Sequence, residues 1–252
     1  MTVLRSLALA TIAAPFALAL SACGSKEDTA PGVAPTGKAV GQVSAPAGQM
    51  WSDVVSATDG GGMRMGNPNA PLKLVEYGSL SCPHCAKLAN DGMKTLVDKY
   101  VNSGRVSYEF RSFPIHGIID VPLTVMVRCA DKAAFFPLVE QIYAGQEAMM
   151  TRAEQGNSQA EAASKLPPNQ RFAALADAFG LTDWFAARGL SKDQAHSCLA
   201  DTSAAEKVAN EGQKWSDAGI NSTPTLELNG GTLKDVYEWD QLEPVLQNAG
   251  AR

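Results

Sequence analysis

The sequence predicts an α/β fold that is interrupted by a long all-helical insertion. Two β-rich runs, at 72–77 and 105–115, flank a segment with helical periodicity from 83 to 101. The order strand, helix, strand is typical of a βαβ unit. Between 118 and 218 the patterns are helical, and they predict the insertion. The chain has 252 residues, 45% of them hydrophobic, which is enough for one domain with a core of its own.

The N-terminal residues predict an export signal. Arg5 precedes an apolar run from Leu7 to Leu20, which is shorter than the roughly 20 residues of a membrane span. The run ends in Leu20-Ser21-Ala22-Cys23, which resembles the lipobox of bacterial lipoproteins, where cleavage leaves the cysteine as a lipidated N-terminus. We therefore expect a signal peptide at 1–22 and a periplasmic protein anchored to a membrane through a lipid on Cys23. An ordinary signal peptide with an incidental cysteine is the alternative.

Residues 23–48 predict a flexible tether, because Pro, Gly, Ala and Ser dominate and few side chains can be buried. The α/β domain is expected at 49–117 and 219–252, with the insertion at 118–218 between its two parts. Within the first part, 49–58 predict a short helical turn and 63–65 a short strand.

The insertion and the C-terminal part complete the predicted elements. Helical patterns are found at 121–131, 133–149, 169–179, 182–188, 191–200 and 201–217. Ser191 is a plausible N-cap, since Gln194 follows three residues later. The stretch "STPTLELNGGTL" indicates a hairpin centred on Asn229-Gly230. A last helix is expected at 238–250.

The charge balance argues against nucleic acid as a partner. The chain has 21 basic and 26 acidic residues, a net charge of −5, and no long basic run. A metal site is not expected either. Cys82 and Cys85 form a C-x-x-C pair, but zinc would need two more ligands, and the other cysteines and histidines form no second pair.

A redox role explains the residues that flank this pair better than a structural disulfide, which would be sterically tight. Pro83 fits the first position of a helix, which makes Cys82 the N-cap residue. A thiolate there is stabilised by free backbone N–H groups and the helix dipole, and His84 can add a proton or a hydrogen bond. Cys85 falls on the apolar stripe. We therefore expect an exposed, reactive Cys82 and a buried Cys85 that resolves the mixed disulfide.

Cys-Pro-His-Cys at a helix start, after an apolar strand and with a helical insertion, resembles the DsbA-type thiol oxidases of the thioredoxin superfamily. The stretch "MGNPNAPLKLVEYGSLSCPHC" resembles their thioredoxin-4 type. The resemblance implies a thioredoxin fold. It also implies that Glu76, six residues before Cys82, is a buried acid that manages the proton of the resolving cysteine. Thr223-Pro224 matches the cis-proline that lies against the active-site disulfide in this superfamily.

The resemblance implies a thiol-disulfide oxidoreductase that needs no cofactor. Such an enzyme donates its disulfide to exported proteins with reduced cysteines and is reoxidised by a DsbB-type membrane partner; we expect a monomer. A threonine at the position of Thr223 is common in disulfide isomerases and in many thioredoxin-4 proteins, so an isomerase or reductase is an alternative. A non-catalytic lipoprotein that uses the thioredoxin frame to bind a partner is the other.

Two cysteines remain after Cys23 and the redox pair are assigned. In an oxidising compartment, Cys129 and Cys198 are predicted to form a structural disulfide between two helices of the insertion. Two buried free thiols, which are common in helical cores, are the alternative.

Overall fold

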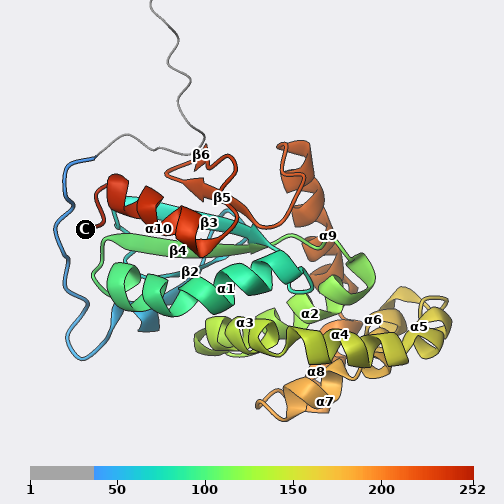
Figure 1. The fold of residues 1–252 in the computed structure, drawn as a ribbon. Coiled ribbons are helices and arrows are strands. Elements are labelled where there is room, and N and C mark those ends of the chain that lie inside the picture. Colours follow the sequence, from blue (N-terminus) through green and yellow to red (C-terminus); the bar gives the residue numbers. More distant parts are fainter. Residues whose placement is uncertain (1–36) are drawn as a thin grey trace, which may run out of the picture. The chain divides into compact units, whose positions relative to one another are not determined.

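The computed structural model describes residues 37–252 (Figure 1). The predicted signal peptide, Cys23 and the first part of the predicted tether lie outside these residues. Within 37–252, no helix combines the length and the apolar character that crossing a membrane requires.

The core of the α/β domain is a mixed sheet with the strand order β1-β2-β4-β3-β5-β6. The central strands β3 and β4 are parallel, and the other pairs are antiparallel. The bounds are β1 Val55–Ala57, β2 Met63–Met65, β3 Leu72–Gly78, β4 Val106–Ser112, β5 Thr225–Leu228 and β6 Gly231–Thr232. Six of the seven residues of β3 are buried, which explains why this strand reads as a continuous apolar run.

The predicted βαβ unit is present. Helix α1, Pro83–Thr95, continues as a single stretch of π-helix, Leu96–Val101, and then β4 returns beside β3. The C-terminal helix α10, Trp239–Asn248, packs next to α1 on the same face of the sheet (Figure 1). A Cβ at Gly92 would lie 2.3 Å from the indole of Trp239, so glycine permits this close approach.

Two local predictions need correction in the first part of the domain. Residues 51–53 form a short 3-10 turn, as predicted, but Val55–Ala57 then form strand β1, which pairs with β2. A three-residue strand has no periodicity that could show it in advance. Strand β4 ends at Ser112, three residues before the predicted end, since Pro114 lacks the N–H that would continue the ladder.

The insertion consists of helices between β4 and β5. Their bounds are α2 Gly117–Cys129, a 3-10 turn at Lys132–Ala134, α3 Phe135–Ala144, α4 Gln146–Gln155, α5 Asn157–Ala163, α6 Pro168–Ala178, α7 Leu181–Ala186, α8 Lys192–Ala200 and α9 Thr202–Asp217. The single helix predicted at 133–149 is divided at Gly145 into α3 and α4. Glycine loses more conformational entropy than other residues when it is held in a helix, which favours an end at this position. Helix α5 is short and polar, so no apolar stripe predicted it.

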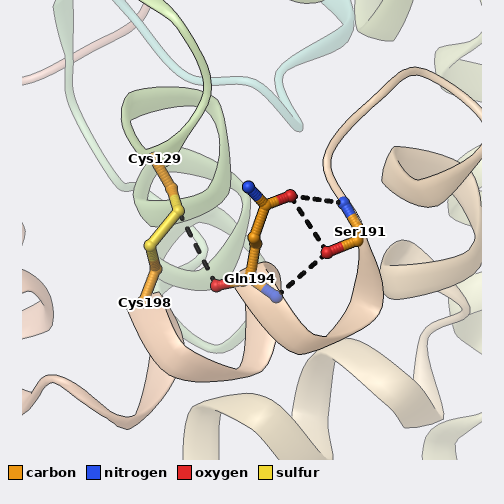
Figure 2. Close-up of a disulfide and its surroundings, with 4 residues drawn as sticks. All are labelled: Cys129, Ser191, Gln194 and Cys198. Atoms are coloured by element: carbon orange, nitrogen blue, oxygen red, sulfur yellow. Dashed lines mark hydrogen bonds between the residues drawn. A yellow bond between two sulfur atoms is a disulfide. The ribbon is translucent and has the colours of Figure 1, made fainter.

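A disulfide joins Cys129 at the end of α2 to Cys198 on α8, with 6.3 Å between the Cα atoms (Figure 2). The bridge links two helices of the insertion, as the sequence predicts. The same view shows the cap of α8: Ser191 Oγ accepts the Gln194 N–H, and Gln194 Oε1 accepts the Ser191 N–H.

Residues 37–43, here called the strap, lie against the domain, so these residues are not part of the flexible tether that the sequence predicts through residue 48. The N–H of Gly37 donates to Asn248 O over 2.6 Å, and the N–H of Val40 donates to Gly250 O over 2.9 Å. The N–H of Val43 donates to Ser103 O over 2.9 Å. Backbone hydrogen bonds of this kind leave no trace in side-chain composition.

Candidate functional site

Cys82 and Cys85 lie at the start of α1, just beyond the carboxyl end of β3. Cys82 is the N-cap residue, with extended backbone angles, and Pro83 takes the first helical position, as the sequence predicts. Both cysteines are free thiols. The end of β3 and the start of α1 therefore bring the pair to one end of the sheet.

Cys82 is more buried than the sequence indicates. Its exposed fraction is 3%, against 0% for Cys85, so the prediction of an exposed Cys82 is wrong. The loop before β5 lies beside it: the Cys82 sulfur is 3.4 Å from the carbonyl oxygen of Thr223. Pro83 and His84 are the exposed residues of the motif. The contact between Cys82 and Thr223 joins residues 141 apart in the sequence, so the neighbours of Cys82 in the chain do not indicate it.

The pKa of Cys82 is lowered to about 5 from an ordinary value of 9.0, although burial opposes this. The largest cause is a hydrogen bond from the Cys85 thiol. The Thr223 side chain and the backbone N–H groups of Cys85 and His84 add to it. The two backbone N–H groups belong to the first turn of α1, so the helix N-terminus is one of the causes. The His84 side chain makes no hydrogen bond to any residue within 37–252, so a part for its imidazole stays a proposal.

Cys85 behaves in the opposite way. Burial raises its pKa well above 9.0, and the Cys82 sulfur and the Glu76 carboxylate raise it further. The backbone N–H of Ser79 works against this rise. The pair therefore holds a thiolate on Cys82 and a proton on Cys85.

Glu76 is a buried acid on β3, with an exposed fraction of 2%. Burial raises its pKa from 4.5 to about 7, while the hydrogen bond from Tyr108 lowers it. Tyr108 Oη lies 2.6 Å from Oε2, and Oε1 has no partner among residues 37–252. A carboxyl group with this pKa is able to accept and return a proton near neutral pH.

The Thr223-Pro224 peptide bond is cis, as the resemblance implies. The Thr223 hydroxyl is buried and has no other partner in the described part of the chain, which leaves it free for the Cys82 sulfur. The redox-site residues named from the sequence are thus brought together by β3, the start of α1 and the loop before β5.

We call residues 79–82 the active-site loop. A set of buried polar side chains surrounds this loop, and the sequence did not indicate them. The set comprises Ser79, Ser81, Asp120, Tyr143 and Gln146. Its members are far apart in sequence, and each alone reads as an ordinary loop or helix residue. No group of residues suited to hold a metal ion is found within 37–252.

A family model described as Thioredoxin matches residues 58–248. A putative protein-disulfide oxidoreductase of Rickettsia bellii is 25% identical over 169 residues, which are 67% of this chain and 57% of that protein. The chain thus spans little more than half the length of this relative.

Two solved structures are similar in fold. The crystal structure of a protein-disulfide isomerase from Novosphingobium aromaticivorans has a TM-score of 0.68 and 26% identity, and the match covers 73% of this chain and 94% of that one. The structure of α-DsbA1 from Wolbachia pipientis has a TM-score of 0.57 and 20% identity, over 74% of this chain and 89% of the other.

Proposed function

Since the chain belongs to the thioredoxin family, we propose that it is a thiol-disulfide oxidoreductase that donates a Cys82–Cys85 disulfide to exported proteins. The observation that carries this proposal is the asymmetry of the pair. The pKa of Cys82 is lowered to about 5, and the pKa of Cys85 is raised well above 9.0. A C-x-x-C disulfide that only stabilises the fold does not require different pKa values for its two cysteines.

The transfer begins from the oxidised pair. A substrate thiolate attacks the Cys82 sulfur, the Cys82–Cys85 bond breaks, and Cys85 leaves as a thiolate that takes up a proton. A second substrate thiolate then attacks the substrate sulfur of the mixed disulfide. Cys82 leaves as a thiolate, and two electrons have passed from the substrate to the enzyme. Because the departing Cys82 thiolate is stabilised, the reduced enzyme is favoured and the disulfide is oxidising.

Glu76 is the proposed proton donor to Cys85. Its carboxyl is buried, and its charge raises the pKa of Cys85, which places the two groups within electrostatic reach of each other. With a pKa of about 7, a large part of the Glu76 population is protonated at neutral pH. The acid is therefore able to supply the proton that Cys85 needs as it leaves.

The cis-proline loop is proposed to hold the substrate segment beside Cys82. Thr223 O is 3.4 Å from the sulfur, so an attacking chain must pass this loop. Reoxidation by a DsbB-type membrane protein, a monomeric state, a periplasmic location and a lipid on Cys23 complete the proposal. The last two rest on the N-terminal sequence motif.

Disulfide isomerisation is the second candidate. The structural neighbour with 26% identity is described as a protein-disulfide isomerase, and Thr223 precedes the cis-proline. An isomerase acts from the reduced form, which the low pKa of Cys82 also favours.

One paired experiment separates the two activities. The oxidised protein is mixed with a reduced peptide that contains two cysteines, and the reduced protein is mixed with scrambled ribonuclease; Cys82→Ser is the control in both. Rapid peptide oxidation with weak unscrambling supports the oxidase. The reverse result supports the isomerase. Failure in both assays would leave a non-catalytic binding protein.

A further inference from the structure

The active-site loop, residues 79–82, is held by side chains of the insertion. All four of its residues are buried. Tyr143 Oη donates to Ser79 O over 3.1 Å. Gln146 Nε2 donates to Leu80 O over 2.9 Å and to Cys82 O over 3.1 Å. The helices inserted into the α/β domain therefore satisfy the backbone of the segment that leads into the cysteine pair.

Asp120, like Gln146, makes two hydrogen bonds to this loop, and it is the charged residue of the set. Its exposed fraction is 1%, and it lies in the first turn of α2. Oδ1 accepts the backbone N–H of Ser81 over 3.0 Å, and Oδ2 accepts the Ser79 hydroxyl over 2.9 Å. Oδ2 also accepts the backbone N–H of His116 over 2.9 Å. An acidic residue in a first helical turn often serves the helix end, but here two of the three bonds go to the active-site loop.

Ser79 connects Asp120 to both cysteines. Its carbonyl oxygen accepts the Cys82 N–H over 3.2 Å. Its own N–H acts on the Cys85 sulfur and lowers the pKa of that thiol against the effect of burial. Its hydroxyl donates to Asp120. One serine is thus bonded to the backbone of Cys82, acts on the sulfur of Cys85, and is itself bonded to the carboxylate of Asp120.

A second link reinforces the first. Ser81 Oγ is 3.1 Å from Ser79 Oγ and 2.8 Å from His116 Nδ1. A buried carboxylate is costly unless it is hydrogen-bonded, and two of the three hydrogen bonds of Asp120 are made to this loop. The hydrogen bonds that compensate for burying the Asp120 carboxylate therefore form in only one conformation of the loop.

We propose that Asp120 is a positioning residue through which the insertion sets the reactivity of the cysteine pair. The inference rests on the proposed redox function of that pair. With Asp120 in place, Ser79 and Ser81 hold Cys82 where the Cys85 thiol and Thr223 reach its sulfur. Without it, the loop is free to shift, and the Cys82 thiolate loses these partners.

The test compares Asp120→Asn and Ser79→Ala with the wild type. A matched control is Thr182→Val, which removes a hydrogen bond of 2.6 Å from an equally buried residue to Asp177, inside the insertion and away from the loop. Three quantities are measured on each purified protein: the pKa of Cys82 from the ultraviolet absorbance of its thiolate, the redox equilibrium with glutathione, and the thermal unfolding midpoint.

Asp120→Asn is expected to raise the pKa of Cys82 above about 5 and to shift the glutathione equilibrium toward the disulfide form of the protein by roughly tenfold. Ser79→Ala shifts both in the same direction by less. Thr182→Val lowers the unfolding midpoint and leaves both redox measurements at the wild-type values.

Wild-type titration and equilibrium in Asp120→Asn, with only a lower unfolding midpoint, would overturn the proposal and leave Asp120 a purely structural residue. If Asp120→Asn does not fold, Ser79→Ala decides by the same criteria. Failure of the proposed function is seen separately, as a wild-type protein that does not oxidise a dithiol peptide, because the Cys82 titration needs no substrate.

Discussion

The hydroxyl of Tyr108 on β4 donates a hydrogen bond of 2.6 Å to the carboxylate of Glu76 on the adjacent strand β3. Both side chains are buried, at 2% exposure each. Burial raises the pKa of Glu76, and this bond lowers it. The balance between the two leaves the pKa at about 7, so Tyr108 sets the pH range in which Glu76 exchanges protons.

Tyr108→Phe is therefore expected to raise the pKa of Glu76 above about 7, by about one unit or more, because the carboxylate loses a hydrogen-bond donor. The limb of the pH–rate profile for thiol exchange that belongs to Glu76 should move to higher pH. Tyr100→Phe is the matched control, since Tyr100 makes a bond of the same 2.6 Å to Glu243. A profile that moves equally in both variants would refute the assignment.

Three variants should separate the roles of the proposed active-site residues. Cys82→Ser abolishes exchange with substrate thiols, because the attacked sulfur is gone. Cys85→Ser leaves Cys82 able to react, so mixed disulfides with exported proteins accumulate. Glu76→Gln slows exchange and keeps the fold. Non-reducing electrophoresis and stopped-flow exchange kinetics provide the measurements. Trapped complexes in Cys82→Ser, or none in Cys85→Ser, would reverse the roles of the cysteines.

The stability of the reduced protein should rise with pH. The folded pKa of Cys82 is about 5 and its ordinary value 9.0, so between these values the unfolded state binds more protons. The stabilisation is complete above pH 9.0 and is lost as the pH falls through about 5. Glu76 acts in the opposite sense between 4.5 and about 7, where the folded state holds the extra proton.

The measurement is the urea midpoint of the reduced and oxidised forms across this range. Only the reduced form has a Cys82 thiolate that stabilises the fold. The difference in urea midpoint between the reduced and oxidised forms should therefore grow from pH 5 to pH 9. The reduced Cys82→Ser variant should lose this growth. A difference that is independent of pH would show that the Cys82 thiolate is not stabilised by the fold.

Replacing Cys129 and Cys198 together by Ser should lower the free energy of unfolding. The disulfide closes a loop with a sequence separation of 69 residues, worth on the order of 4 kcal/mol in the chain-entropy account. The pKa of Cys82 should not change, because the bridge makes no contact with the active-site loop. Urea unfolding and thiolate titration test the two statements; an unchanged midpoint would contradict the first.

The strap provides a test by truncation. A chain that starts at residue 37 keeps the bonds from Gly37, Val40 and Val43, whereas a chain that starts at residue 44 loses all three. The shorter chain should be less stable by about 2–3 kcal/mol, at roughly 1 kcal/mol for each hydrogen bond. Equal urea midpoints for the two chains would show that residues 37–43 behave as the tether that composition predicts.

The parts of the structure that sequence predicts are those whose signal is local. Strand β3, the start of α1 at Pro83 and the cap at Ser191 each follow from neighbouring residues. The burial of Cys82 depends on Thr223, and the role of Asp120 depends on Ser79 and Ser81 in another element. Such contacts have no pattern along the chain, because each residue finds its partner only after folding.

The strap lies at the end of the sheet opposite to the cysteine pair. Ser103, its partner, stands just before β4, and Cys82 stands just after β3; because these strands are parallel, the two residues mark opposite ends of the sheet. The strap runs beside the C-terminus at that far end (Figure 1). If Cys23 carries a lipid, the intervening residues reach at most roughly 50 Å when fully extended. The domain would then be joined to the bilayer at the end of the sheet opposite to Cys82.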